Sequence, residues 1–265
     1  MPAARSAVTA VPLDGLRIIA INVNSIVGIH RRAELLDFAA RQQPDIVLIS
    51  ETHLSPRRSI TFKDFEFVRN DRRNCDGGGG TGILVGRHYR FRHINRPEFE
   101  TFECIEVSCI LFSLPRGGNL YILSVYAVGN NRAKFREEFH SLFTILELNR
   151  LHNYYIIAGD LNAKHTSWLN ATNNPRGVFL KSWIEQYQIE YKCELYGSES
   201  PTWPRANSYL DLCIADARLN FNFRKPQRKL QTLPYDSDHN AILIEVLFDG
   251  RRVHFCRQWR PQAEL

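Results

Sequence analysis

Apolar runs and amphipathic segments alternate at the start of the chain, and this alternation predicts an α/β fold. Leu16–Val23 and Asp45–Ser50 are apolar runs of strand length. Between them, Arg31–Gln42 carries apolar residues at helical spacing. Pro44 ends this segment because proline cannot continue a helix. The opening is therefore predicted to be a strand, a helix and a second strand.

The rest of the chain first continues in strand patterns and then returns to alternation. Phe65–Val125 consists mainly of apolar runs separated by turns rich in glycine and proline, which predicts antiparallel sheet. The later predicted elements are a helix over Phe135–Leu146, a strand over Tyr154–Gly159, a helix around Leu180–Tyr187, and strands over Tyr209–Ala215 and Ala241–Leu247.

Length and composition favour one large domain between two tails. The chain has 265 residues, 44% of them hydrophobic, which suits a single domain with a substantial core. Residues 1–14 lack periodicity and are predicted to form a flexible N-terminal tail, residues 15–248 the catalytic domain, and residues 249–265 a basic C-terminal tail or linker. Because the sequence shows neither a signal peptide nor an apolar stretch of membrane-spanning length, we expect an intracellular protein without a membrane partner.

Charge and cysteine content narrow the function only slightly. The 34 Lys and Arg exceed the 28 Asp and Glu, and the resulting net charge of +6 favours a polyanionic partner. A solvated basic surface explains this charge equally well. The six cysteines lack the CxxC spacing of zinc and redox sites, so we expect reduced thiols.

Acidic and amide residues interrupt or end several apolar runs, and they are the main functional signal. Each alone is more often an ordinary strand-end residue than a ligand. Their repeated occurrence, in order, favours a shared site, because strand ends are where open sheets place their ligands. Carboxylates, amides and one imidazole together could hold a divalent metal and a phosphate. These residues are Asn22, Glu51, Asp160, Asn162, Asp211, Asp238 and His239.

Seven motifs carry a resemblance that covers most of the ordered body. In order they are INVNS, SETHL, GGTGILV, SVYAVG, AGDLNAKH, YLDLCIA and SDHNAI. Together they resemble the endonuclease/exonuclease/phosphatase superfamily, and within it the apurinic-endonuclease-like nicking domain of non-LTR (LINE-type) retrotransposons. The resemblance implies a DNase-I-like α/β fold: a four-layer αββα sandwich of two mostly antiparallel sheets flanked by helices.

The resemblance also implies a metal site and a water-activating group. Glu51 would be the principal ligand of Mg²⁺, with Mn²⁺ as a possible replacement, and Asn22 and Asp238 would support it. Asp160 would orient or deprotonate the attacking water, and Asn162 would hold the nucleophile or a phosphate oxygen.

Further residues would bind the phosphate. His239 would contact the scissile phosphate, with Asp211 orienting its imidazole and favouring the charged form. Tyr126 would donate to the phosphate or the leaving oxygen. The asparagine that usually follows this tyrosine is missing, and Asn130 or Asn131 could substitute for it.

The implied function is nicking of one strand of double-stranded target DNA. The 3′-hydroxyl would prime reverse transcription, within a larger polyprotein that includes a reverse transcriptase and acts in the nucleus after cytoplasmic synthesis. The segment PTWPRANSY resembles a hairpin that probes a DNA groove, although a plain connection is equally compatible with it. The predicted DNA contacts are Arg205, Asn207 and Ser208 in this segment, together with Arg72 and Arg73.

Two other functions remain open at this stage. One is another phosphoesterase activity of the same superfamily, such as apurinic-site repair or hydrolysis of a lipid or nucleotide phosphate. The other is a nucleic-acid-binding module that keeps the fold without catalysis. The complete set of acidic, amide and imidazole residues argues against this second alternative.

Overall fold

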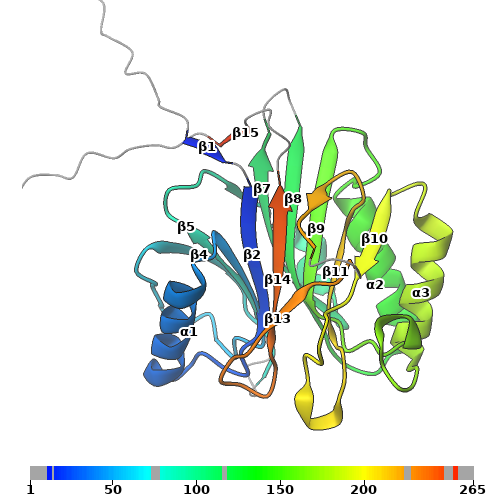
Figure 1. Cartoon of the computed structure of the whole chain (residues 1–265), viewed down its shortest axis with the longest axis horizontal. Coiled ribbons are helices and arrows are strands. Elements are labelled where there is room, and N and C mark those ends of the chain that lie inside the picture. Colours follow the sequence, from blue (N-terminus) through cyan, green and yellow to red (C-terminus); the bar gives the residue numbers. More distant parts are fainter. Residues whose placement is uncertain are drawn as a thin grey trace, which may run out of the picture.

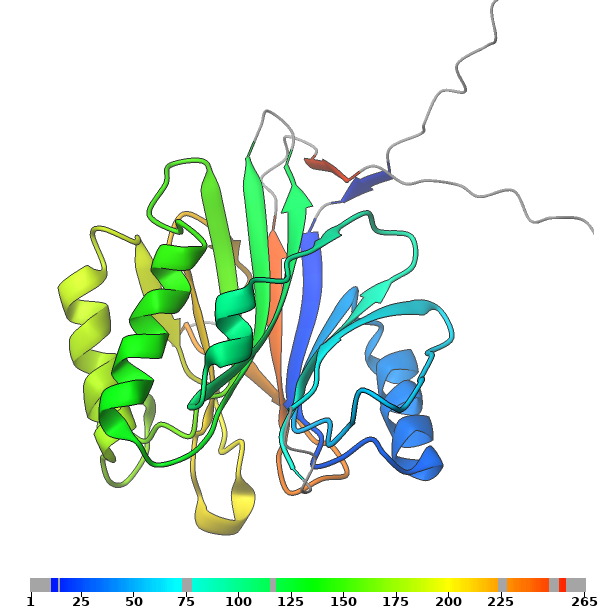
Figure 2. The same ribbon diagram turned by 180° about the vertical axis from the view of Figure 1, so that it is seen from behind.

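The computed structural model describes residues 11–13, 15–72, 78–114, 118–223, 228–247 and 253–255. In this part of the chain, two β-sheets pack face to face and helices cover both outer faces (Figure 1). The view from behind shows α2 (Arg132–Ile145) and α3 (Pro175–Tyr187) side by side on one outer face and α1 (Ile29–Gln42) beyond the other sheet (Figure 2). The predicted αββα sandwich is therefore confirmed.

The first sheet contains the strand, helix and strand opening predicted from the sequence. Its first two strands run parallel because a helix crosses between them, whereas the other described pairs in this sheet are antiparallel. The elements are β2 (Gly15–Asn22), α1 (Ile29–Gln42), β3 (Ile46–Ser50), β4 (Phe65–Asn70), β5 (Thr81–Gly86), β12 (Asn220–Phe221), β13 (Gln231–Leu233) and β14 (Ala241–Leu247). The spatial order is β12-β14-β2-β3-β5-β4, and β13 pairs with β14.

The second sheet is likewise mostly antiparallel. Its spatial order is β10 (Cys193–Tyr196), β11 (Asp211–Asp216), β9 (Asn153–Asp160), β8 (Asn119–Ala127), β7 (Ile105–Ser113) and β6 (Arg92–His93). β8 and β9 run parallel, joined by α2 (Arg132–Ile145), and α3 (Pro175–Tyr187) follows β9. Short 3-10 helices occur at η1 (Pro97–Thr101), η2 (Thr166–Trp168) and η3 (Pro204–Ala206). The segment 65–125, predicted as antiparallel sheet, is thus divided between both sheets.

Alternating side chains of the central strands enter different cores. Ile18 and Ile156 face the core between the two sheets. Their neighbours Ile19 and Ile157 face the outer layers, where they pack with α1 and with α2 and α3 respectively. Since successive side chains of a strand point to opposite faces, a strand covered on both faces must be apolar throughout. This explains why these strands appear in the sequence as continuous apolar runs.

Side-chain caps fix where two of the helices begin. Asn131 accepts a hydrogen bond from the backbone N–H of Lys134 and caps α2. Asn174 accepts from the N–H of Gly177 and caps α3, whose first residue is Pro175. Both helices therefore begin on the side of the molecule to which the strands β8 and β9 lead.

The two predicted tails fall largely outside the described residues. Within them the structure describes two short strands, β1 (Val11–Leu13) and β15 (Val253–Phe255), which pair antiparallel. They lie at the top of Figure 1, opposite the end that carries the loops after β2, β3 and β9. None of the helices in the described parts of the chain is long and apolar enough to cross a membrane.

Candidate active site

The strand register brings the predicted site residues to one end of the sandwich. In the second sheet Asp160 is the register partner of both Tyr126 and Asp211. In the first sheet Asn22 ends β2 and lies beside Ser50, the last residue of β3, which Glu51 follows. Residues that are far apart in the sequence therefore meet because their strands end at the same edge.

Hydrogen bonds between the sheets hold their ends together at this edge. The Ser50 hydroxyl donates to the carbonyl of Val125 at 3.1 Å, and the Ser124 hydroxyl donates to the carbonyl of Ile49 at 2.9 Å. All four residues of this crossing are buried, which favours the pairing of their polar groups. The relative position of the two halves of the site is thus fixed by direct bonds beneath it.

Asn22 joins two carboxylates from different sheets. Its Nδ2 atom donates to Oε1 of Glu51 at 2.8 Å and to Oδ2 of Asp160 at 3.0 Å. Asn22 is only 1% exposed, so both bonds lie away from bulk water. An amide that offers two donors is suited to hold two negatively charged groups close to each other.

Glu51 is kept ionised by its neighbours. Burial by itself raises the pKa of Glu51, but hydrogen bonds from His53, Tyr126 and Asn22 outweigh burial and lower the pKa to about 2. His53 Nε2 lies 3.2 Å from Oε2 of Glu51. Burial and the bond to Glu51 raise the pKa of Tyr126, so its hydroxyl stays protonated and remains a donor.

Asp160 is buried, and its environment raises its pKa to about 7, so the carboxyl group is partly ionised at neutral pH. Burial raises the pKa of Asp160, and the negative charge of Asp211 raises it further. The backbone N–H of Asn162 donates to its Oδ1 atom at 2.9 Å. The Asn162 side chain donates to the carbonyl of Ala127 at 3.0 Å, which fixes the orientation of its amide group.

His239 and Asp211 form a buried pair. His239 Nδ1 lies 2.8 Å from Oδ2 of Asp211, and Nε2 lies 3.9 Å from Oδ2 of Asp160. Burial lowers the pKa of His239, but the carboxylates of Asp211, Asp160 and Asp238 outweigh burial and raise the pKa to about 9. The imidazole therefore carries a positive charge at neutral pH and can donate from Nε2.

The residues predicted to hold a metal are linked by one chain of hydrogen bonds. Asn22 binds Glu51, and its Oδ1 atom accepts from the backbone N–H of Asn24 at 3.0 Å. The Asn24 side chain in turn donates to Oδ1 of Asp238 at 3.2 Å. Asp238 therefore lies beside this group, on the loop that precedes His239.

An ionised Glu51 next to a second carboxylate is a suitable donor set for a hard cation such as Mg²⁺. Among the residues that the structure describes, there is no group of three or more His, Cys, Asp or Glu arranged to hold a metal ion. Protein ligands other than these, bound water and phosphate oxygens would then complete the coordination, as is common for Mg²⁺.

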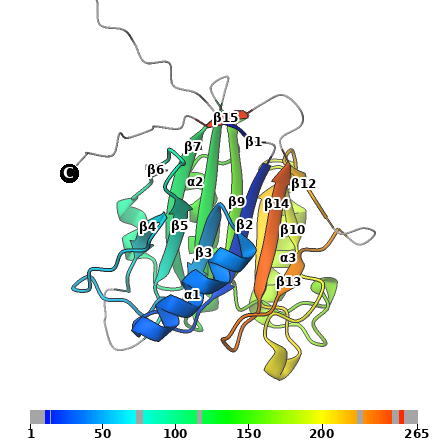
Figure 3. The ribbon, with the colours of Figure 1, turned by 60° about the vertical axis from the view of Figure 1, so that its left-hand side comes forward.

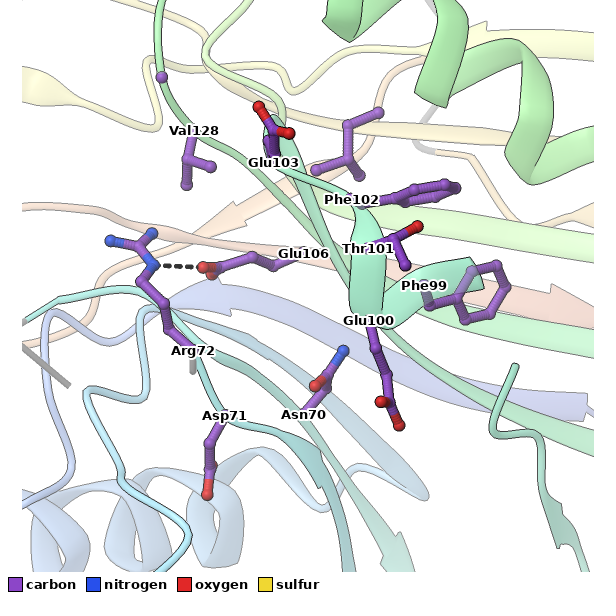
Figure 4. Close-up of a pocket in the computed structure, with 12 residues that line it drawn as sticks. Asn70, Asp71, Arg72, Phe99, Glu100, Thr101, Phe102, Glu103, Glu106 and Val128 are labelled. Atoms are coloured by element: carbon purple, nitrogen blue, oxygen red, sulfur yellow. Dashed lines mark hydrogen bonds and ion pairs between the residues drawn. The ribbon is translucent and has the colours of Figure 1, made fainter. Parts of the chain in front are cut away.

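A cavity of about 520 Å³ is lined by residues at the end of β4, in η1, at the start of β7 and after β8 (Figure 4). Arg72, one of the predicted DNA contacts, lines it and forms an ion pair with Glu106. The other oxygen of Glu106 accepts from the N–H of Gly80 at 2.6 Å. Arg73 lies outside the described residues.

The predicted hairpin exists, but its three predicted DNA contacts differ in position. Arg205 and Asn207 are exposed at its tip. Ser208 is only 3% exposed, and its hydroxyl donates to the carbonyl of Ala206 within the hairpin, so its side chain does not face outward. Of the two asparagines considered as substitutes after Tyr126, Asn131 uses its side chain to cap α2.

Two residues that contact the site, His53 and Thr202, were not predicted from the sequence. His53 binds Glu51. In a regular strand, residues two apart point to the same face, and this spacing alone does not predict a bond between their side chains. Here Glu51 and His53 both have positive φ, 58° and 54°, so the chain turns after β3. No sequence pattern marks Thr202 as a site residue, yet its Oγ1 accepts a hydrogen bond from the N–H of Asp211 at 3.1 Å.

Comparison with known proteins identifies the class of this fold. Residues 120–243 match the family described as endonuclease-reverse transcriptase. The structure resembles the apurinic endonuclease of Leishmania major with a TM-score of 0.64 and 16% identity, covering 90% of this chain and 93% of that chain. The chain is thus a domain with the DNase-I-like endonuclease/exonuclease/phosphatase fold.

Within this class the similarity extends to non-LTR retrotransposons, as the motifs predicted. The endonuclease domain of the telomere-specific retrotransposon TRAS1 has a TM-score of 0.66 at 20% identity, covering 88% of this chain and 98% of that chain. The probable RNA-directed DNA polymerase from transposon BS of Drosophila melanogaster is 25% identical over 91% of this chain and 25% of its own length. The RNA-directed DNA polymerase from mobile element jockey of Drosophila funebris is 25% identical over 80% of this chain and 22% of its own length. The chain spans about a quarter of the length of these relatives.

Proposed function

We propose that this chain is the Mg²⁺-dependent endonuclease of a non-LTR retrotransposon and nicks one strand of duplex DNA. The observation that carries the proposal is the bridge from Asn22 to Glu51 and Asp160, with the Asp211–His239 pair beside it. The similarity to retrotransposon polyproteins and the net charge of +6 support a DNA substrate. We also propose that the chain belongs to a larger polyprotein with a reverse transcriptase and acts in the nucleus.

The residues at the site divide the chemistry of phosphodiester hydrolysis among them. Asp160 takes a proton from the attacking water, a role that its raised pKa suits, and the water oxygen bonds to phosphorus as the bond to the 3′-oxygen breaks. The protonated Tyr126 hydroxyl donates a hydrogen bond to the leaving 3′-oxygen, which takes up a proton from water to give the 3′-hydroxyl. The charged His239 donates from Nε2 to a phosphate oxygen and so stabilises the negative charge that develops there. Glu51 would hold Mg²⁺, with support from Asn22 and Asp238, and Mn²⁺ could replace it. When bound, this cation would supply further positive charge at the phosphate.

A nicking assay on supercoiled plasmid tests the proposal. With Mg²⁺ we expect open-circular product, and with EDTA none. The nicks should support extension by a DNA polymerase without prior phosphatase treatment, because hydrolysis is expected to leave a 3′-hydroxyl. Asp160→Asn should lower the rate by about 10²-fold or more, since it removes the proton acceptor.

A parallel assay separates this function from repair of abasic sites. Plasmids with and without abasic sites are compared under the same conditions, and we expect intact DNA to be nicked at a comparable rate. Cleavage confined to abasic DNA would replace the retrotransposon function with a repair function. Failure of the wild-type chain to cleave either plasmid would overturn the proposal.

A further inference from the structure

The hairpin between Thr202 and Tyr209 projects from the end of the molecule that carries the site. It is the yellow loop at the bottom of Figure 1, and it projects from the same end in Figure 3. Trp203 and Ser208 close it with two backbone hydrogen bonds, of 2.8 Å and 3.1 Å. The tip between them is a single 3-10 turn, Pro204–Ala206, so the hairpin is short and closed by direct bonds.

Thr202 fastens the base of this hairpin to Asp211 and to the residue after His239. Its Oγ1 atom accepts from the N–H groups of Leu210 and Asp211, at 3.0 Å and 3.1 Å. Its carbonyl accepts from the N–H of Asn240, the residue after His239, at 2.8 Å. Thr202 is completely buried, so water cannot replace these bonds without opening the structure.

Trp203, the next residue, covers the ring of His239. The two ring centroids lie 6.5 Å apart with an angle of 26° between the planes, a stacked arrangement. Lys164 Nζ lies 5.5 Å from the centroid of the indole. The hydrogen bond to Asp211 holds the imidazole at Nδ1, whereas at Nε2 the ion pair to Asp160 is longer, 3.9 Å, so the ring can still tilt about the bond to Asp211. The indole is placed to restrict that tilt.

We infer that Trp203 is a positioning residue for His239, and that Thr202 joins the hairpin rigidly to the His239–Asp211 pair. The inference rests on the proposed function, in which His239 donates to the scissile phosphate. In this inference the tip of the hairpin contacts DNA, and the base of the hairpin orients the catalytic side chain of His239. Movement of the hairpin on DNA would then be transmitted directly to the imidazole.

Two substrates distinguish this role from direct contact with DNA. Bis(p-nitrophenyl) phosphate is a small diester that reaches the catalytic groups without spanning the hairpin, whereas supercoiled plasmid can contact both. For Trp203→Ala we expect kcat to fall by about tenfold to a hundredfold on both substrates, with KM for the small diester nearly unchanged. Trp203→Phe keeps a flat ring and should stay within about threefold of wild type. Loss on plasmid alone would overturn the inference.

Two further variants act as controls. Pro204 follows Trp203 in the same hairpin, and Pro204→Ala should keep the wild-type rate on the small diester. Thr202→Ser keeps the hydroxyl that accepts from Asp211 and should behave likewise, whereas Thr202→Val removes it and should lower kcat on both substrates. Unfolding midpoints measured for all variants identify any loss of activity that comes from misfolding. If Trp203→Ala does not fold, Trp203→Phe remains as the informative variant at this position.

Nitrogen-15 NMR of the His239 ring tests the positioning role without any catalysis. In the wild type we expect a slowly exchanging Nδ1 proton, protected by Asp211 and by the indole above it. In Trp203→Ala this proton should exchange at least about tenfold faster and the ring signals should shift. Unchanged exchange and shifts would overturn the inference even if the chain is an active nuclease. Should the wild type cleave neither substrate, the proposed function fails and this measurement still decides the inference.

Discussion

His239 Nδ1 lies 2.8 Å from Oδ2 of Asp211, and this buried contact connects the loop before β14 of one sheet with the first residue of β11 in the other. The other oxygen of Asp211, Oδ1, is buried and has no hydrogen-bond partner among the residues that the structure describes. An unpaired carboxylate oxygen in a buried position is costly, and a charged imidazole beside it offsets part of that cost. The pair therefore couples the charge of His239 to the stability of the fold.

This coupling predicts a pH dependence of unfolding. The pKa of His239 is about 9 in the folded chain and 6.5 ordinarily. A raised pKa means that the stabilisation is fully present below pH 6.5 and is lost as the pH rises through about 9. Urea unfolding in EDTA at several pH values should show this loss for the wild type and a flatter profile for Asp211→Asn. Equal slopes for the two proteins would contradict the assignment.

Removal of the Asn22 side chain should damage both stability and activity. In Asn22→Ala, Glu51 and Asp160 each lose a donor in a buried place, so we expect about 1–3 kcal/mol lower free energy of unfolding and strongly reduced nicking. Urea unfolding and the plasmid assay measure the two effects. Asn119→Ala is a matched control, because it also removes a side-chain amide bond, to Asn153, but at the start of β8. Wild-type nicking by Asn22→Ala would remove Asn22 from the site.

Glu51→Gln should increase the Mg²⁺ concentration needed for half-maximal nicking. The substitution removes the negative charge that the low pKa of Glu51 otherwise maintains, and we expect an increase of about tenfold or more. Titration of the plasmid assay with MgCl₂ gives this concentration. Glu66→Gln on the exposed side of β4 should leave it unchanged. The proposed ligand role is wrong if the two variants respond alike.

Gly159 precedes Asp160 and is required by close packing. A Cβ atom there would lie 2.0 Å from the carbonyl oxygen of Val125, and φ is +149°, which side chains disfavour. We therefore expect Gly159→Ala to lower the free energy of unfolding by about 3 kcal/mol or more. Gly28→Ala is the control, since its nearest neighbour would be 3.9 Å away. Similar stability of both variants, measured by denaturant unfolding, would show that β8 and β9 can separate at little cost.

The order and type of the central elements could be predicted from sequence. Continuous apolar runs such as Ile46–Ser50 have strand length, and the face of α1 that holds Leu35 and Phe38 follows the helical period. The division of the middle strands between two sheets could not. β5 and β7 carry similar apolar patterns, and pairing of β5 with β3 depends on contacts far along the chain.

At the site, the sequence by itself determined which carboxylates, amides and imidazole were candidates, because polar residues at the ends of apolar strands are costly without a partner. The tertiary structure decided how they are used. His53 reaches Glu51 because of two positive φ angles, and Ser208 points inward because the hairpin folds over it. The stack of Trp203 on His239 depends on two loops meeting across the gap between strands. Such contacts arise from long-range packing, which local periodicity does not encode.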